Sequence, residues 1–204
     1  EITLRKRIPL AAGLAGGSAD AAAVLRGLNI LWRLDLTETR LATLAAGLGS
    51  DVPFCLQGGT ALATGRGERI TPLPDLPPWG VVLVKPPLKV STAWAYGNYR
   101  PAAVTVHPDT AGLVRCIRRA DINGVARRLG NVLESVTART YPEIGRLKKL
   151  LLAQGALAGL MSGSGPTVFG LTEDIQQARY IAGKIKDHCA AEVVAAEFVA
   201  KGRG

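Results

Sequence analysis

Residues 9–20 have the sequence Pro-Leu-Ala-Ala-Gly-Leu-Ala-Gly-Gly-Ser-Ala-Asp. This small-residue stretch follows Glu1–Ile8, where Ile2 and Leu4 are interspersed with polar and charged side chains, and that pattern predicts a strand with one wet face. It precedes Ala19–Trp32, which is rich in helix formers and is predicted to be a helix. A glycine-rich loop that leads from a strand into a helix is a common way to build a phosphate-binding site.

The glycines of this loop have a direct physical use. Gly13, Gly16 and Gly17 lack Cβ atoms, so their N–H groups can approach a ligand closely. The N-terminus of the following helix adds partial positive charge and unpaired N–H donors, both of which favour phosphate. The hydroxyl of Ser18 can bind a phosphate oxygen or a Mg²⁺ ion. The predicted nucleotide-binding residues of this segment are Pro9, Leu10, Ala11, Ala12, Gly13, Leu14, Ala15, Gly16, Gly17, Ser18 and Ala19.

Two familiar phosphate-binding patterns do not match this loop. The Walker pattern needs Gly-Lys-Ser/Thr, and no lysine follows the glycines. The dinucleotide fingerprint Gly-x-Gly-x-x-Gly needs a different glycine spacing. An alternative without a ligand is a small-residue turn that lets the helix pack tightly.

The composition is that of an ordinary globular protein. Of the 204 residues 48 % are hydrophobic and 20 % charged. The net charge of +9 comes from basic residues dispersed over predicted helices without aromatic interleaving, so we expect no nucleic-acid partner. No apolar run is long enough to predict a membrane span. Cys55, Cys116 and Cys189 are scattered, which predicts reduced thiols and no metal cluster.

The rest of the chain predicts an α+β protein with two domains. Pro86-Pro87 ends a predicted strand and divides residues 1–85 from residues 86–204, a predicted C-terminal α/β sandwich domain. Asp51–Leu56 fits either a short helical turn or a strand. Strands are predicted at 60–64, 81–85, 158–162, 167–171 and 193–198, and helices at 38–48, 91–98, 110–119, 122–128, 131–138, 142–154 and 174–188.

Several segments together resemble one enzyme family. The loop at 9–22 resembles the second signature of the galactokinase–homoserine kinase–mevalonate kinase–phosphomevalonate kinase (GHMP) superfamily, a family of two-layer α+β kinases. Within it, the chain is most similar to the kinases that act on a cytidine diphosphate-linked methylerythritol. The similarity extends from Lys6 to about Phe198. The other matching segments are Leu48–Phe54, Gly58–Ala61, Gly65–Glu68, Asn131–Glu134 and Ser162–Pro166, the last resembling the third signature.

The resemblance implies roles for individual residues, each with a simpler alternative. Asp51 would be the catalytic acid–base residue, although its place after Gly49-Ser50 by itself favours an ordinary helix start. Lys6 would lie near the adenine or the phosphates, or else be an exposed strand lysine. Gly163, Ser164 and Gly165 would form a second tight turn near the phosphate site, with Gly163 and Ser164 binding substrate, or else an ordinary hairpin loop. Tyr96 would stack on the cytosine, whereas its neighbour Trp94 is at least as well suited to core packing.

The implied activity is ATP-dependent phosphorylation of the 2-hydroxyl of that substrate, with Mg²⁺ as the second cofactor and no protein metal ligands assigned. The resemblance also implies a further segment before Glu1 that carries the first signature and completes the N-terminal domain. Residues 1–85 would then be the remainder of an ATP-binding domain, and residues 86–204 the C-terminal domain on the substrate side. Without the preceding segment we expect weak or absent activity and an exposed sheet edge, and that edge makes a homodimer one of the states to consider. The location would be the bacterial cytoplasm or a plastid. The alternatives are a homoserine- or mevalonate-type kinase and a non-catalytic nucleotide-binding fragment.

Overall fold

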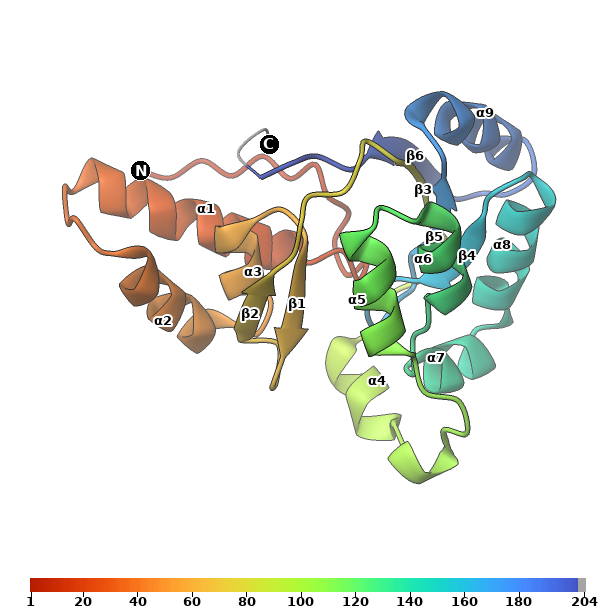
Figure 1. Ribbon diagram of the computed structural model, residues 1–204, viewed down its shortest axis with the longest axis horizontal. Helices are drawn as coiled ribbons and strands as arrows, with labels where there is room; N and C mark the ends of the chain where they lie inside the picture. Colours follow the sequence, from red (N-terminus) through yellow and green to blue (C-terminus); the bar gives the residue numbers. More distant parts are fainter. Residues whose placement is uncertain (202–204) are drawn as a thin grey trace. The chain divides into compact units, whose positions relative to one another are not determined.

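The computed structural model describes residues 1–201, which divide into two compact units (Figure 1). The first unit contains residues 1–10, 15–75 and 200–201. The second contains residues 11–14 and 76–199. The chain therefore passes from the first unit into the second and back again within the glycine-rich loop.

The first unit consists of three helices and a hairpin. Its helices are α1 (Gly16–Leu31), α2 (Glu38–Leu48) and α3 (Val52–Gln57), and its strands β1 (Ala61–Thr64) and β2 (Arg69–Pro72) pair antiparallel. Thr37 caps α2 as predicted, because its hydroxyl accepts a hydrogen bond from the Arg40 N–H (3.3 Å). A small core forms where the three helices meet, from Ala22, Leu41, Ala45, Val52 and Leu56.

The second unit is built on a four-stranded antiparallel sheet. Its strands are β3 (Gly80–Lys85), β4 (Ala158–Met161), β5 (Val168–Thr172) and β6 (Glu192–Glu197), in the order β4-β5-β3-β6. The register pairs Val82 with Gly170 and with Ala195, so that Val82 and Val84 are fully buried in the centre of the sheet.

Helices cover both faces of this sheet (Figure 1). On one face, α8 (Pro142–Ala153) and α9 (Ile175–Lys186) form the main core with Val82, Val84 and Val168. Because successive strand residues point to opposite faces, Leu171 belongs instead to a second core. That core includes Trp79 and residues of α5 (Thr110–Arg118) and α6 (Ile122–Arg128). The remaining elements are α4 (Thr92–Asn98), the 3₁₀ helix η1 (Pro101–Ala103) and α7 (Glu134–Thr140).

The predicted α+β class is confirmed, with three local differences. The predicted strand at Glu1–Ile8 is wrong: this segment pairs with no strand among residues 1–201, and Ile2 and Leu4 are 64 % and 57 % exposed. An alternating pattern indicates a face preference, but a strand also needs a hydrogen-bonded neighbour. The strand β2 was not predicted. Finally, β3 pairs with β5 and β6 and lies in the second unit, whereas the predicted division at Pro86 left it in the first.

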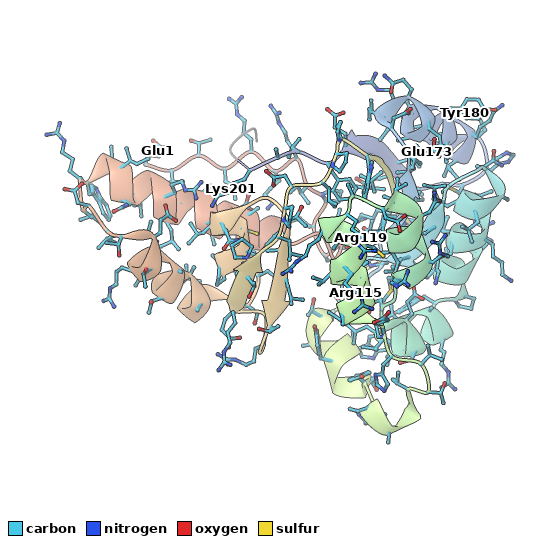
Figure 2. All side chains as sticks on the ribbon, in the orientation of Figure 1. Glu1, Arg115, Arg119, Glu173, Tyr180 and Lys201 are labelled. Carbon is cyan, nitrogen blue, oxygen red and sulfur yellow. The ribbon has the colours of Figure 1, made fainter. Side chains whose placement is uncertain are left out.

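Several charged and aromatic side chains are exposed on the helices of the second unit. Arg115 and Arg119, at the end of α5, and Tyr180, on α9, are exposed (Figure 2). The Lys184 ammonium lies 5.6 Å from the centre of the Tyr180 ring, a cation–π contact within α9. Over residues 1–201, no helix has both the length and the apolar character needed to cross a bilayer.

Candidate functional site

The first turn of α1 leaves three backbone donors open. The helix begins at Gly16, so Gly16, Gly17 and Ser18 form its first turn and not a loop as predicted. Ala15 takes the N-cap position with φ of 50°, and its carbonyl accepts the Ala19 N–H (2.9 Å). Among the described residues, no hydrogen bond uses the N–H groups of Gly16, Gly17 or Ser18, and no side chain caps the helix. This end of α1 can therefore bind an anion.

Lys6 lies beside this helix. Its ammonium forms an ion pair with the Asp20 carboxylate on α1, and both side chains are about one-third exposed or less. A Cβ on Gly16 would lie 3.0 Å from Cγ2 of Ile8, so the chain before the loop runs close to the first turn of α1. The residue predicted to lie near the phosphates is thus held next to the helix that begins with the three open N–H groups.

The middle of the loop, Ala11–Leu14, packs against the turn at Ser162–Pro166. The Ser162 hydroxyl donates a hydrogen bond to the Gly13 carbonyl (2.7 Å), and the Thr167 N–H donates to the Ala12 carbonyl (3.4 Å). Gly13 has φ of +70°, and a Cβ added there would lie 2.4 Å from the Ser162 carbonyl oxygen. Only glycine fits this position, both for its conformation and for the space. Two glycine-rich segments far apart in sequence therefore form one surface.

Hydroxyl groups of Thr92 and Thr137 hold the Ser162–Pro166 turn in place. The Ser164 hydroxyl lies 3.0 Å from the Thr92 hydroxyl, and the Thr137 hydroxyl donates to the Ser164 carbonyl (3.2 Å). Ser164 is buried, so its side chain serves these internal contacts, whereas Gly163 is exposed. Sequence reasoning missed Thr92 and Thr137. A lone threonine on a helix carries no signal that it will meet a turn 30 or 70 residues away.

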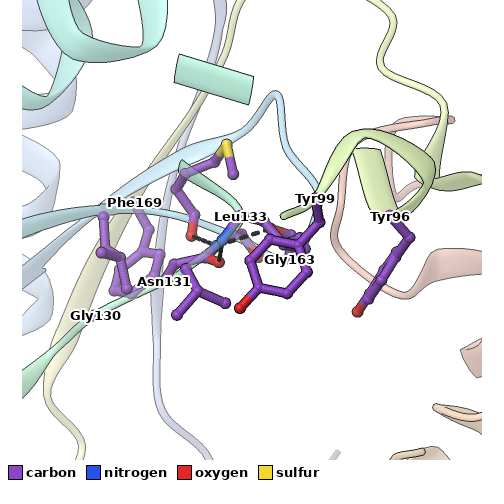
Figure 3. Close-up of a pocket in the computed structure, with 11 residues that line it drawn as sticks. Tyr96, Tyr99, Gly130, Asn131, Leu133, Gly163 and Phe169 are labelled. Carbon is purple, nitrogen blue, oxygen red and sulfur yellow. Dashed lines mark hydrogen bonds between the residues drawn. The ribbon is translucent and has the colours of Figure 1, made fainter. Parts of the chain in front are cut away.

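A cavity of about 420 Å³ lies beside this turn (Figure 3). Tyr96 and Tyr99 line it together with Asn131, Gly163 and Phe169, so the cavity has aromatic walls and several backbone polar groups. Tyr96 is 62 % exposed, so a ligand in the cavity can reach its side chain.

Trp94 has a different environment from Tyr96. Its ring packs edge-on against Tyr141, with centroids 5.9 Å apart. That contact agrees with the core-packing alternative for Trp94.

Asp51 is exposed at the N-terminus of α3. It occupies the N-cap position, but its carboxylate accepts no capping hydrogen bond and is therefore available for other contacts. Burial, and secondarily the negative charge of Asp51, raise the pKa of the Cys55 thiol one turn further along. All three cysteines are free thiols, as predicted.

Metal binding by the protein alone has no support in the described part of the chain. Within residues 1–201, no three His, Cys, Asp or Glu side chains are grouped so that they could hold an ion. Ser18 and Asp20 are the residues at the start of α1 whose side chains carry oxygen atoms.

Sequence and structure comparisons identify the family of this chain. The protein-family model described as "GHMP kinases N terminal domain" matches residues 1–59. The family model described as "GHMP kinases C terminal" matches residues 113–191. A crystal structure of 4-(cytidine 5'-diphospho)-2C-methyl-D-erythritol kinase is 37 % identical, with a TM-score of 0.80 over 95 % of this chain and 68 % of that one. The chain belongs to the GHMP kinase family.

Curated relatives of this GHMP kinase chain share one name. The 4-diphosphocytidyl-2-C-methyl-D-erythritol kinase of Geobacillus kaustophilus is 54 % identical over 188 residues, which are 92 % of this chain and 64 % of the relative. The enzyme of the same name from Listeria monocytogenes serotype 4a is 48 % identical over the same shares. The chain thus spans slightly less than two thirds of these relatives. A homoserine kinase from Cytophaga hutchinsonii, 23 % identical with a TM-score of 0.79, shares the fold.

Proposed function

We propose that the protein containing this chain transfers the γ-phosphoryl group of ATP to the 2-hydroxyl of 4-diphosphocytidyl-2-C-methyl-D-erythritol, a step of non-mevalonate isoprenoid precursor synthesis. The observation that carries the proposal is the packing of Gly13 against the Ser162–Pro166 turn, which joins two family signatures in one surface. The identity of about 50 % with relatives of that name supports this alcohol over others in the family.

The nucleotide phosphates would bind at the start of α1. The open N–H groups of Gly16, Gly17 and Ser18 supply donors, and the helix dipole favours negative charge there. Lys6 is close to this helix and can offset phosphate charge, with Asp20 holding its ammonium in place. Ala11–Leu14 belong to the same predicted nucleotide-binding segment of the sequence.

Asp51 would act on the substrate hydroxyl. Phosphoryl transfer needs the attacking oxygen to be oriented and to lose its proton, and a carboxylate can do both. The carboxylate of Asp51 is exposed and makes no capping hydrogen bond, so it can contact a ligand directly.

Mg²⁺ fits the donors at the start of α1. Magnesium in nucleotide sites takes oxygen ligands and uses one or two protein groups together with phosphate oxygens. The Ser18 hydroxyl would be the protein ligand, and the phosphates of ATP the others. The ion would neutralise part of the phosphate charge when bound.

The cytidine end of the substrate would contact the second unit. Tyr96 presents an exposed ring beside the cavity and would stack on the cytosine, while the exposed backbone of Gly163 would contact the substrate. In this proposal residues 1–85 form the ATP-binding part and the later residues form the substrate side. A small-molecule substrate, the lack of a nucleic-acid partner, and a homodimer remain predictions.

The test is a comparison of acceptor alcohols with the full-length protein that contains residues 1–204. Transfer of labelled phosphate from ATP is measured with 4-diphosphocytidyl-2-C-methyl-D-erythritol, homoserine and mevalonate under the same conditions. We expect kcat/KM to be at least about 10³-fold higher for the cytidyl substrate, because a site built to bind its polar groups rejects alcohols that lack them. Preferential phosphorylation of mevalonate or homoserine would assign a different GHMP activity. Binding of ATP without transfer to any acceptor would favour the non-catalytic alternative.

A further inference from the structure

Met161, the last residue of β4, is held at both of its backbone polar groups. Its N–H donates to Oε1 of Glu134 (2.8 Å), and its carbonyl accepts Nδ2 of Asn131 (2.9 Å). The same Asn131 amide donates to the Gly163 carbonyl (2.7 Å), as the dashed lines of Figure 3 show. We call these three hydrogen bonds the Asn131–Glu134 clamp. They fix the chain on both sides of Ser162.

The two side chains of the clamp are themselves fixed. Oδ1 of Asn131 accepts the Leu133 N–H (2.9 Å), so the amide has its NH₂ group toward the two carbonyls. Oε2 of Glu134 accepts the Lys148 ammonium of α8 (2.6 Å), and both side chains of this ion pair are mostly buried. The clamp is therefore rigid and leaves little room for Ser162 to move.

The position of Ser162 determines the position of the loop. Its hydroxyl donates to the Gly13 carbonyl, and its own carbonyl would be 2.4 Å from a Cβ at Gly13. Because Gly13 packs directly on the Ser162 backbone and accepts its hydroxyl, a displaced Ser162 would displace Ala11–Leu14 as well. The Ser162 N–H also donates to the Thr167 carbonyl (2.9 Å), and the Thr167 N–H donates to the Ala12 carbonyl (3.4 Å).

We propose that Asn131 is a positioning residue for nucleotide binding. Its amide places the Ser162–Pro166 turn, and the turn places Ala11–Leu14, which belong to the predicted nucleotide-binding segment. The proposal rests on the proposed ATP-dependent function. It predicts that Asn131 affects the affinity for ATP although its side chain contacts no part of the nucleotide.

Asn131→Asp tests this with almost no change of shape. The new carboxylate can still accept the Leu133 N–H, but its second oxygen faces the carbonyls of Met161 and Gly163 and repels them. Asn123→Asp, at an exposed position of α6, is the matched control for the added charge. Asn131→Ala, which removes the donors without adding charge, is the second variant.

We expect Asn131→Asp to raise KM for ATP about tenfold or more, the equivalent of losing hydrogen bonds and gaining a repulsion. The change in kcat should stay within about threefold, because the reacting groups are untouched. Asn123→Asp should leave KM unchanged, and Asn131→Ala should raise it less.

An unchanged KM in folded Asn131→Asp, or an equal rise in Asn123→Asp, would overturn the proposal. If neither Asn131 variant folds, Asn131 is a structural residue and the proposal also fails. Calorimetric titration with ATP alone separates this outcome from failure of the proposed kinase function. If the unaltered protein binds ATP but transfers no phosphate, the proposed function fails, and the dissociation constants of the variants still decide the role of Asn131.

Discussion

Asp51 is placed by its neighbours in sequence. Gly49 ends α2, Ser50 turns the chain, and Pro53 stands in the first turn of α3, where a proline needs no N–H partner. Asp51 then stands at the N-terminus of a short helix whose next residues, Val52 and Pro53, are buried. Val52 and Pro53 anchor the start of α3 because their side chains are buried, and the Asp51 carboxylate stays exposed.

The pKa of the Cys55 thiol depends in part on the charge of Asp51. Burial and the Asp51 carboxylate both raise the pKa of Cys55, so the thiol is largely protonated at pH 8. Asp51→Asn removes the second cause, lowers this pKa and increases the thiolate fraction. We expect iodoacetamide to modify Cys55 about twofold faster or more, as followed by peptide mass spectrometry. Asp35→Asn, at an exposed position, is the control, and an unchanged rate in Asp51→Asn would contradict the predicted electrostatic coupling.

The junction between the glycine-rich loop and the Ser162–Pro166 turn depends on the absence of one side chain. Gly13 combines φ of +70° with backbone oxygens of Ser162 and Gly165 at 2.4 and 2.9 Å from where a Cβ would lie. These neighbours are backbone atoms and cannot rotate away. The two elements pack together because the loop supplies no Cβ at this contact.

Gly13→Ala should therefore disrupt both stability and binding. We expect the free energy of unfolding to fall by about 1–3 kcal/mol from strain, and the dissociation constant for ATP to rise about tenfold. Gly183→Ala is the matched control: it lies inside α9 with nothing within 4 Å of the added Cβ, and should gain about 0.5–1 kcal/mol. Urea unfolding and calorimetry measure both quantities. Equal tolerance of the two substitutions would show that the loop does not pack on the turn as described.

Sequence reasoning succeeded where the signals are local. The helices at 38–48, 110–118 and 142–153 follow from apolar periodicity, capping residues and Pro142, all within a few residues of each element. It failed for Glu1–Ile8, because strand formation depends on a partner that the pattern does not specify. The start of α1 was misplaced because Gly16 and Gly17 are weak helix formers, yet Ala15 closes the first turn over them.

The candidate site was only partly predictable for the same reason. The glycines of both signatures and Asp51 were predicted as site residues from motifs that also carry the family resemblance, and their roles stay predictions. The contacts of Asn131, Thr92 and Thr137 with the turn depend on the tertiary fold. In the sequence, Asn131 belongs to the Asn131–Glu134 segment that matches the family, but that match does not predict which groups its amide binds.

At the scale of the whole chain, the predicted site residues are distributed over both units. Lys6, Asp51 and the first turn of α1 belong to the first unit, whereas Gly13, Tyr96 and the Ser162–Pro166 turn belong to the second. The chain spans 64 % of its relative from Geobacillus kaustophilus, so activity must be measured with the full-length protein.

The most direct test of the account is phosphoryl transfer by Asp51→Asn in that full-length protein. We expect its dissociation constant for ATP to stay within about threefold of the unaltered value, because Asp51 is assigned to the acceptor hydroxyl and not to the phosphates. The rate of transfer to 4-diphosphocytidyl-2-C-methyl-D-erythritol should fall about 10²- to 10⁴-fold, while Asp35→Asn keeps both values. Undiminished transfer by Asp51→Asn, or a loss of ATP binding that accounts for the whole loss of rate, would contradict the account.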